Sequence, residues 1–319
     1  MKKFAMAAVA AAALSAGVAQ AYTVGTFSNG LVVPNVIHNG PTDTTAVGLI
    51  NQSGATRAIY WTFFDQDSNH VTDGCFTMTD KDYEPFVWSG QSGGGLEGVR
   101  GYLVFTVGGD AANVPITTCA GTATLAADAD AGAAATEIAA NAFQVNVTAA
   151  DVAFIPVIDG PLTLAAATTD VTTMGPDSLT AVAGAAQVAA APAATQFSMR
   201  YAIDQAAGGT DTAVVVWSTG SQKGTHTVNI YDNAQNRKSV NFVLTKAELD
   251  WFNPESILGL PATHKDGFIE WAPNAGARPV GAPAAPASLY DVGGSVFTYS
   301  VIIAPAFGAV QSVLGAHRL

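Results

Sequence analysis

The chain has 319 residues, 49% of them hydrophobic and only 12% charged, and its formal net charge at pH 7 is −12. An acidic chain without a basic cluster repels nucleic acid and anionic membrane surfaces, so we exclude both as binding partners. Alanine, glycine, threonine and valine dominate and lysine is scarce, which is typical of exported β-structure with weakly charged surfaces.

The first 21 residues have the pattern of a secretory signal peptide. Lys2 and Lys3 give a positive start, residues 4–18 are apolar, and residues 19–21 (AQA) supply the small side chains that precede cleavage. The apolar run is shorter than the roughly 20 residues of a membrane span, although a retained N-terminal anchor is the alternative. We therefore expect a mature chain without an integral membrane segment, exported to the periplasm, the cell surface or the extracellular space.

A weak repeat divides the remainder of the chain. The tripeptide TAV at residues 45–47 recurs at 212–214, and further matches follow in the same order with nearly constant spacing. At offsets of 166 or 167 they pair Phe64 with Tyr231, Phe76 with Phe242, Phe86 with Phe252 and Gly101 with Gly267, while Phe27–Phe197 before the tripeptide and Phe143–Phe297 after these pairs keep the order at other offsets. The repeat predicts two domains related by internal duplication, at residues 22–160 and 195–319.

The clearest strands of the two copies differ in their outer faces. Residues 59–64 and 226–231 both alternate with period two, which indicates strands with one buried face. The second strand has a polar outer face. The first is apolar on both faces, so it lies either between two layers or under a partner.

Turn signals and short strands predict an all-β fold. We expect two tandem antiparallel β-sandwiches, Ig-like or jelly-roll-like, with polar turns at residues 65–69 and 232–236. A single larger sandwich or barrel built from both halves is the alternative. The capping-box pattern Thr245–Glu248, with its counterpart Thr79–Asp82, predicts one short helix in each domain.

Two segments interrupt this pattern. Residues 161–194 are rich in alanine, threonine and proline, and we expect a linker there. Residues 108–141 form a long excursion that contains Cys119. Because an exported chain meets an oxidising compartment, we expect a Cys75–Cys119 disulfide that ties the excursion to the sheet.

Four oxygen-bearing side chains in and after the first polar turn have spacings similar to a calcium loop. They are Asp65, Asp67, Asn69 and Asp73. An EF-hand needs glycine at its sixth position and an acid at its twelfth, and His70 and Phe76 stand there instead. A hairpin turn is the favoured interpretation, and calcium is the one cofactor that the sequence suggests.

Aromatic residues form a second candidate surface. Tyr60, Phe64 and Trp88 would bind a ligand such as a sugar, or form an interface, if their rings faced outward. Packing in the core is the favoured interpretation.

The sequence assigns no catalytic residue. The segment GQSGG at residues 90–94 resembles the nucleophile loop of trypsin-like proteases, with glutamine in place of aspartate. Only His38 and His70 precede Ser92, too close in sequence for that two-barrel fold, so a flexible loop is favoured. No two histidines have the spacing of a local metal site.

These observations favour an exported, non-enzymatic protein that has a structural, assembly or adhesion role, with a second copy or a surface component as partner. Two alternatives stay open. One is a secreted or periplasmic binding module for a glycan, calcium or a small ligand. The other is a secreted hydrolase whose site is dispersed in the sequence.

Overall fold

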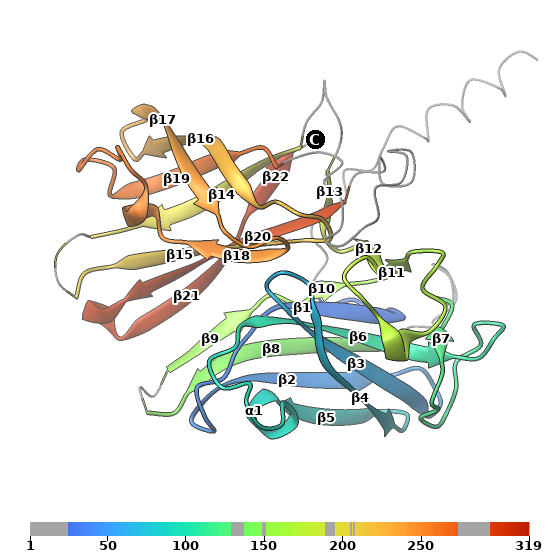
Figure 1. Ribbon diagram of the computed structural model, residues 1–319. Coiled ribbons are helices and arrows are strands. Elements are labelled where there is room, and N and C mark those ends of the chain that lie inside the picture. Colours follow the sequence, from blue (N-terminus) through green and yellow to red (C-terminus); the bar gives the residue numbers. More distant parts are fainter. Residues whose placement is uncertain are drawn as a thin grey trace, which may run out of the picture.

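The computed structural model describes residues 25–128, 137–148, 151–188, 195–204, 206, 208–273 and 294–318. This part of the chain is nearly all β, with several antiparallel sheets and one α-helix, α1 (Trp88–Gln91), so the expected all-β class is confirmed (Figure 1). The expected signal peptide lies outside the described residues. No helix in the described ranges is long and apolar enough to cross a membrane.

The first half of the chain forms two sheets. Sheet I contains, in spatial order, β5 (Asp82–Val87), β2 (Asp43–Asn51), β8 (Ile138–Asn146) and β9 (Asp151–Ile155). Sheet II contains β10 (Ile158–Asp159), β1 (Gly30–Val36), β6 (Gly101–Gly109), β3 (Arg57–Asp65) and β4 (His70–Met78), and β7 (Thr124–Leu125) pairs with β6.

The second half also forms two sheets. Sheet III contains β13 (Ala186–Gln187), β20 (Ser295–Ala304), β15 (Asp211–Ser218) and β18 (Leu249–Phe252), and β21 (Ala309–Leu314) pairs with β20. Sheet IV contains β17 (Arg237–Leu244), β16 (Gly224–Asp232), β19 (Asp266–Trp271), β14 (Gln196–Ala202) and β22 (Ala316–Arg318). The described residues of this half also contain the 3-10 turns η2 (Pro254–Ser256) and η4 (Pro305–Phe307).

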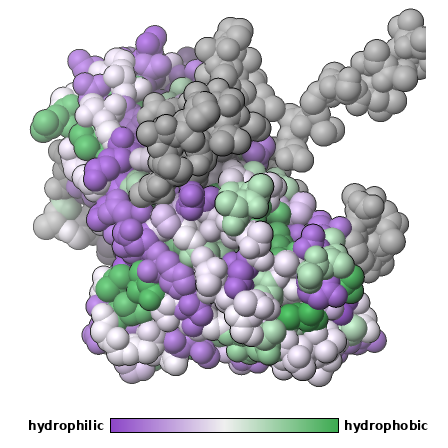
Figure 2. All heavy atoms as spheres, turned by 45° about the vertical axis from the view of Figure 1, so that its right-hand side comes forward, coloured by the Kyte–Doolittle hydropathy of each residue, from purple (hydrophilic) through white to green (hydrophobic). Residues whose placement is uncertain are grey.

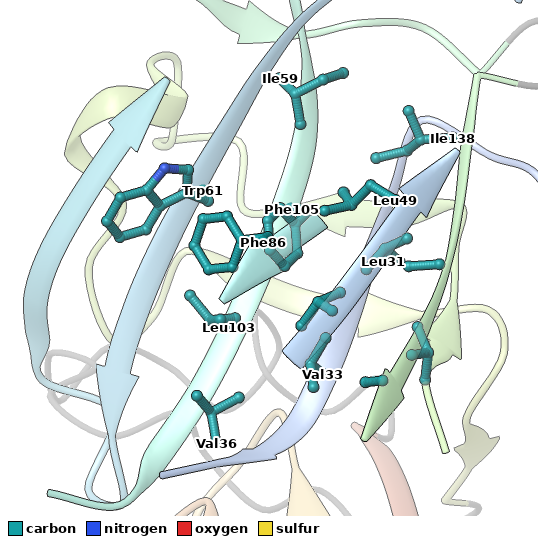
Figure 3. Packing of buried hydrophobic residues seen from close by; sticks show 14 of the residues in the cluster. Leu31, Val33, Val36, Leu49, Ile59, Trp61, Phe86, Leu103, Phe105 and Ile138 are labelled. Carbon is teal, nitrogen blue, oxygen red and sulfur yellow. The ribbon is translucent and has the colours of Figure 1, made fainter. Parts of the chain in front are cut away.

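Each pair of sheets encloses a hydrophobic core. Between sheets I and II, alternate residues such as Leu31, Leu49 and Phe105 point inward and are almost fully buried (Figure 3). Between sheets III and IV, Phe197, Trp271 and their neighbours do the same. Period-two alternation places these side chains on the inner face of each strand, so both halves are sandwich-like.

The two halves have the same strand order. In sheets II and IV the order β1-β6-β3-β4 matches β14-β19-β16-β17, strand for strand along the chain. In sheets I and III the order β5-β2-β8-β9 matches β18-β15-β20-β21. The register agrees as well, because Val47 is paired with Phe86 in the first half and Val214 with Phe252 in the second.

A third core joins the halves and makes a stack of four sheets (Figure 1). It contains the outer face of sheet II, including Tyr60 and Tyr102, and the outer face of sheet III, including Trp217 and Tyr299. The rings of Tyr102 and Trp217 meet edge to face at 5.9 Å. The apolar outer face of the strand at residues 59–64 is therefore covered by the second half of the same chain.

The segment expected as a linker is structured over residues 161–188. It contains the antiparallel pair β11 (Leu162–Leu164) and β12 (Leu179–Val182), the 3-10 turn η1 (Val171–Thr173) and β13. Leu162, Val171, Met174 and Val182 are buried in the third core. These side chains fill the space beside sheets II and III, and the remaining residues of the segment, 189–194, lie outside the described ranges.

The short helices expected at Thr79–Asp82 and Thr245–Glu248 are a wrong prediction, because both segments are turns. At the second turn the amide groups of Thr245 and Lys246 donate to Oδ2 of Asp250 on β18, at 2.5 and 3.0 Å. At the first, Lys81 has a positive φ of 60°, which ends any helical run. A strand residue thus satisfies the donors that a helix would have left free.

The expected Cys75–Cys119 disulfide is confirmed, with a Cα–Cα distance of 5.9 Å. It links β4 to the loop that follows β6, within the excursion at residues 108–141. The phenol oxygen of Tyr60 accepts from the amide of Ala120 at 2.7 Å beside the bridge. The bond therefore acts as a structural staple for a long connection.

Candidate functional site

The outer face of sheet I is exposed, and none of the outward residues that the structure describes on its four strands is charged. The strand register aligns its outward residues in rows, for instance Ala46 between Val87 and Phe143 on the neighbouring strands. The outward residues are Ala46, Gly48, Ile50, Tyr83, Pro85, Val87, Ala139, Asn141, Phe143, Val145, Val152 and Phe154. Asparagine is the one strongly polar residue among them, although acids and bases make up 12% of the chain.

Several large side chains on this face remain accessible. Tyr83 is 60% exposed, Val152 53%, Val87 40% and Phe143 37%. Scattered single hydrophobic residues on a surface need no explanation, but a contiguous set on one sheet face marks an interaction surface. On the face of the molecule that Figure 2 shows, hydrophobic residues lie in small separate groups among hydrophilic ones.

Local packing holds the ring of Tyr83 against the sheet. Gly48 on the central strand β2 has no side chain, and a Cβ there would lie 2.6 Å from the hydroxyl of Tyr83. Tyr83 therefore covers the backbone of β2. The rings of Phe143 and Phe154 meet edge to face at 5.7 Å across β8 and β9. These contacts place aromatic rings on all three of the strands β5, β8 and β9 of the exposed face.

The matching face of the second half is covered. By strand order and register, Gly48, Ile50 and Tyr83 of sheet I occupy the places of Val215, Trp217 and Leu249 of sheet III. Those three residues are buried in the third core against sheet II. A sheet face in this position can thus support a large apolar contact.

The aromatic residues singled out in the sequence are buried. Tyr60 and Phe64 lie in the third core at 4% and 1% exposure, and Trp88 lies in the core of the first half, packed against Phe63 at 4.3 Å. Tyr60 and Phe64 form an interface with the other half of the chain, one of the expected possibilities. The structure does not bring the three together into one ligand surface.

The four calcium candidates form and flank a hydrogen-bonded hairpin turn. Oδ1 of Asp65 accepts from the amides of Asp67 and Asn69, both at 2.9 Å. Asp73 is paired with His70 at 2.9 Å, away from the turn. Among the described residues no three His, Cys, Asp or Glu side chains are grouped so that they could hold a metal ion.

The first turn instead contacts the second half. Asp67 binds the Lys246 ammonium at 2.8 Å and the amide of Ala247 at 3.1 Å. Behind it, Ser68 donates to Oε2 of buried Glu248 at 2.6 Å, and Tyr102 donates to the same oxygen at 2.9 Å. Burial, followed by the charge of Glu248, raises the pKa of Tyr102 well above its ordinary value, so the phenol stays a donor.

Ser92 and His38 lie within hydrogen-bond distance, at 3.0 Å between Oγ and Nε2, and both are buried. Nδ1 of His38 accepts from the amide of Gly40 at 3.4 Å, which leaves the ring proton on Nε2. His38 then donates to Ser92, which is opposite to the direction that activates a nucleophile. No carboxylate within the described ranges forms a hydrogen bond with His38, so the pair has the role of a loop anchor.

Sequence reasoning missed the exposed face because its residues are spread over four strands. A signal existed in two of them: Tyr83, Pro85 and Val87 alternate with polar or buried positions, and residues 139–145 have apolar side chains on both faces. Without the pairing of β5, β2 and β8 these short runs could not be joined into one surface.

Comparison of this chain with protein-family models, with curated proteins and with solved structures found no match.

Proposed function

We propose that the protein is an exported, non-enzymatic assembly protein whose molecules associate through the outer face of sheet I. The observation that carries this proposal is the uncharged, aromatic and exposed character of that face in an acidic chain. Burial of apolar surface is the main driving force for association, and it acts where no charge has to be desolvated.

A second copy of the chain is the occupant that fits best. The molecule has a net charge of −12, so a face without acids is where two copies approach with least repulsion. The other outermost face, on sheet IV, carries Arg200, Asn229 and Glu270, which suits water. Pairing of sheet I with sheet I about a twofold axis is therefore preferred to pairing of sheet I with sheet IV.

The size of the face sets the expected strength. For four strands of about seven residues, a strand spacing of about 4.8 Å and a rise of about 3.4 Å per residue give the face an area of roughly 450 Å². A stable interface buries about 800 Å² on each partner. We therefore expect a reversible dimer, in the micromolar range, which would become effective where molecules are concentrated at a surface.

We also propose that the two halves, each a β-sandwich, arose by duplication of one unit. Shared strand order supports this, as do two glycines at matching places: a Cβ at Gly101 would lie 2.0 Å from the carbonyl oxygen of Phe64, and one at Gly267 1.8 Å from that of Tyr231. The strand register corrects one pair of the sequence repeat. Phe143 lies opposite Ala46 in the first half, and the residue opposite the matching Ala213 in the second half is Val301. Phe143 therefore corresponds to Val301 and not to Phe297.

The association is tested by sedimentation velocity on the disulfide-bonded mature chain over a range of concentrations. We expect the wild type to dimerise and Val87→Lys to weaken the dimer at least tenfold, because a lysine would be desolvated in the contact. Val243→Lys is the matched control, since Val243 is 56% exposed on β17 of sheet IV. A wild type that stays monomeric at high concentration, or an equal effect of both lysines, contradicts the proposal.

A further inference from the structure

A cleft of about 390 Å³ opens where the two halves meet, beyond the third core. It lies between the β8–β9 edge of sheet I and the strands β15, β20 and β21 of sheet III. Phe154, Val301, Ile303 and Val310 provide apolar walls. A cleft of this size, mostly apolar and with a few polar groups, is the usual form of a site for a small molecule.

The positive charge of Arg100 lies in this cleft. The Arg100 guanidinium is mostly buried, and burial lowers its pKa, while Tyr299 and the more distant carboxylate of Asp250 act in the opposite direction, and the group remains protonated. Nη1 donates to Oδ1 of Asn35 at 2.6 Å, and the guanidinium lies 5.8 Å from the ring of Trp251. No carboxylate in the described part of the chain lies within ion-pairing distance of Arg100.

Neighbouring groups fix the orientation of this arginine. Asn35 donates from Nδ2 to the hydroxyl of Tyr299 at 3.1 Å, so its oxygen is directed at Arg100. Burial raises the pKa of Tyr299 to about 12, and its hydroxyl stays neutral. A planar guanidinium held by an amide and an indole keeps several N–H donors for a carboxylate, which it can bind through two hydrogen bonds.

Carboxylates line the same cleft. Asp43 accepts from Nε2 of Gln144 at 2.7 Å, and Asp211 accepts from Nδ2 of Asn253 at 2.8 Å. Asp151 accepts from the amide of Val152 at 2.9 Å. Each carboxylate is held by an uncharged donor, so the lining of the cleft contains one guanidinium and three carboxylate side chains.

We propose that this cleft binds a small zwitterion of the amino-acid class, with its carboxylate on Arg100, its ammonium toward the acids and its apolar side chain against the walls of the cleft. The pairing relieves the cost of a mostly buried arginine that forms no ion pair with the described residues. A ligand with only a positive charge would be repelled by Arg100. A ligand with only a negative charge would pair with Arg100 but would be repelled by the carboxylates that line the cleft.

Isothermal titration of the mature chain with L-phenylalanine, 3-phenylpropionate and phenethylamine tests this site. We expect saturable binding of phenylalanine and at least tenfold weaker binding of both analogues. Arg100→Gln should weaken phenylalanine binding at least tenfold, while Arg237→Gln, at an exposed arginine on β17, should leave it unchanged. Far-ultraviolet circular dichroism would establish that Arg100→Gln is folded. Arg100→Lys keeps the positive charge but loses the two parallel N–H donors of the guanidinium, so it should give an intermediate affinity.

Other outcomes overturn the assignment. Equal affinity for phenylalanine and phenylpropionate removes the role of the acids, and phenethylamine that binds as well as phenylalanine removes the role of Arg100. Absence of saturable binding by all three probes rejects the site. The variants that test the dimer leave this site intact, because neither Val87 nor Val243 lines the cleft, although Phe154 borders both surfaces.

Discussion

Sheets II and IV have the same strand order and similar inner faces, yet their outer faces are opposite in character. Tyr60, Tyr102 and Val104 of sheet II are buried in the third core, whereas strand order and register place Thr227, Phe268 and Glu270 at the same positions of sheet IV. Both sheets keep an aromatic pair there. Phe64 stacks on Tyr102 at 5.2 Å in the interface, and Tyr231 stacks on Phe268 at 4.8 Å on the surface.

This contrast shows that the inner faces specify the sandwich and the outer faces specify its neighbours. A stacked aromatic pair is compatible with either environment, because its rings cover one another. The surrounding residues decide whether the outer face is buried. Valine and tyrosine favour burial against another sheet, whereas threonine and glutamate favour exposure to water.

The largest expected effect on stability comes from exchanging the residue types of sheets II and IV at one matching outward position. Val104→Glu places an unpaired carboxylate in the third core, and we expect a loss of about 3 kcal/mol or more in the free energy of unfolding. Glu270→Val, at the same place in sheet IV, should change it by less than about 1 kcal/mol. Urea unfolding measures both, and a similar cost for the two variants would show that the covered face is not the decisive difference.

The edge strands β10 of sheet II and β22 of sheet IV give a second contrast, for which we expect an effect of intermediate size on stability. Asp159 on β10 lies opposite Leu31, and His317 on β22 lies opposite Phe197. Burial raises the pKa of Asp159 to about 6, although Thr26 donates to it from both its amide and its hydroxyl, at 2.8 and 3.0 Å. A raised pKa in the folded state means that protonation favours folding, so this stability is complete below pH 3.8 and is lost as the pH rises through about 6.

Asp159→Asn should remove that pH dependence. Relative to the wild type, the variant is expected to gain on the order of 2 kcal/mol between pH 4 and pH 7. Thermal unfolding across this range measures the difference, and His317→Asn provides the matched substitution in the other half. Parallel wild-type and Asp159→Asn curves would contradict the assigned cause.

The smallest effect is expected at the polar turns, where Asp67 matches Ala234. Burial opposes ionisation of Asp67, but the hydrogen bond and charge of Lys246 together hold its pKa below the ordinary 3.8. The pair therefore stabilises above that pH and its contribution is lost as the pH falls through the lowered pKa. Because both side chains are partly exposed, Asp67→Ala should cost less than about 1 kcal/mol, and the loss should shrink in about 1 M salt. A larger loss that persists in salt would point to the backbone of the turn.

Local patterns were enough to predict much of the fold. Period-two alternation located the strands at residues 59–64 and 226–231, and asparagine and aspartate located the turns that follow them. Two cysteines in a chain expected to be exported were enough for the disulfide. The capping-box pattern failed because the donors of Thr245 and Lys246 bind Asp250, a strand residue that a local pattern cannot place.

By itself the sequence determined the all-β class, the positions of several strands and the need for a cover over residues 59–64. Only the tertiary structure decided what the cover is, because Tyr102 and Trp217 meet through the docking of strands far apart in the chain. The same holds for the exposed face of sheet I and for the cleft at Arg100. Both are assembled from several strands, and long-range pairing and packing, rather than local propensity, decide which short apolar runs share a surface.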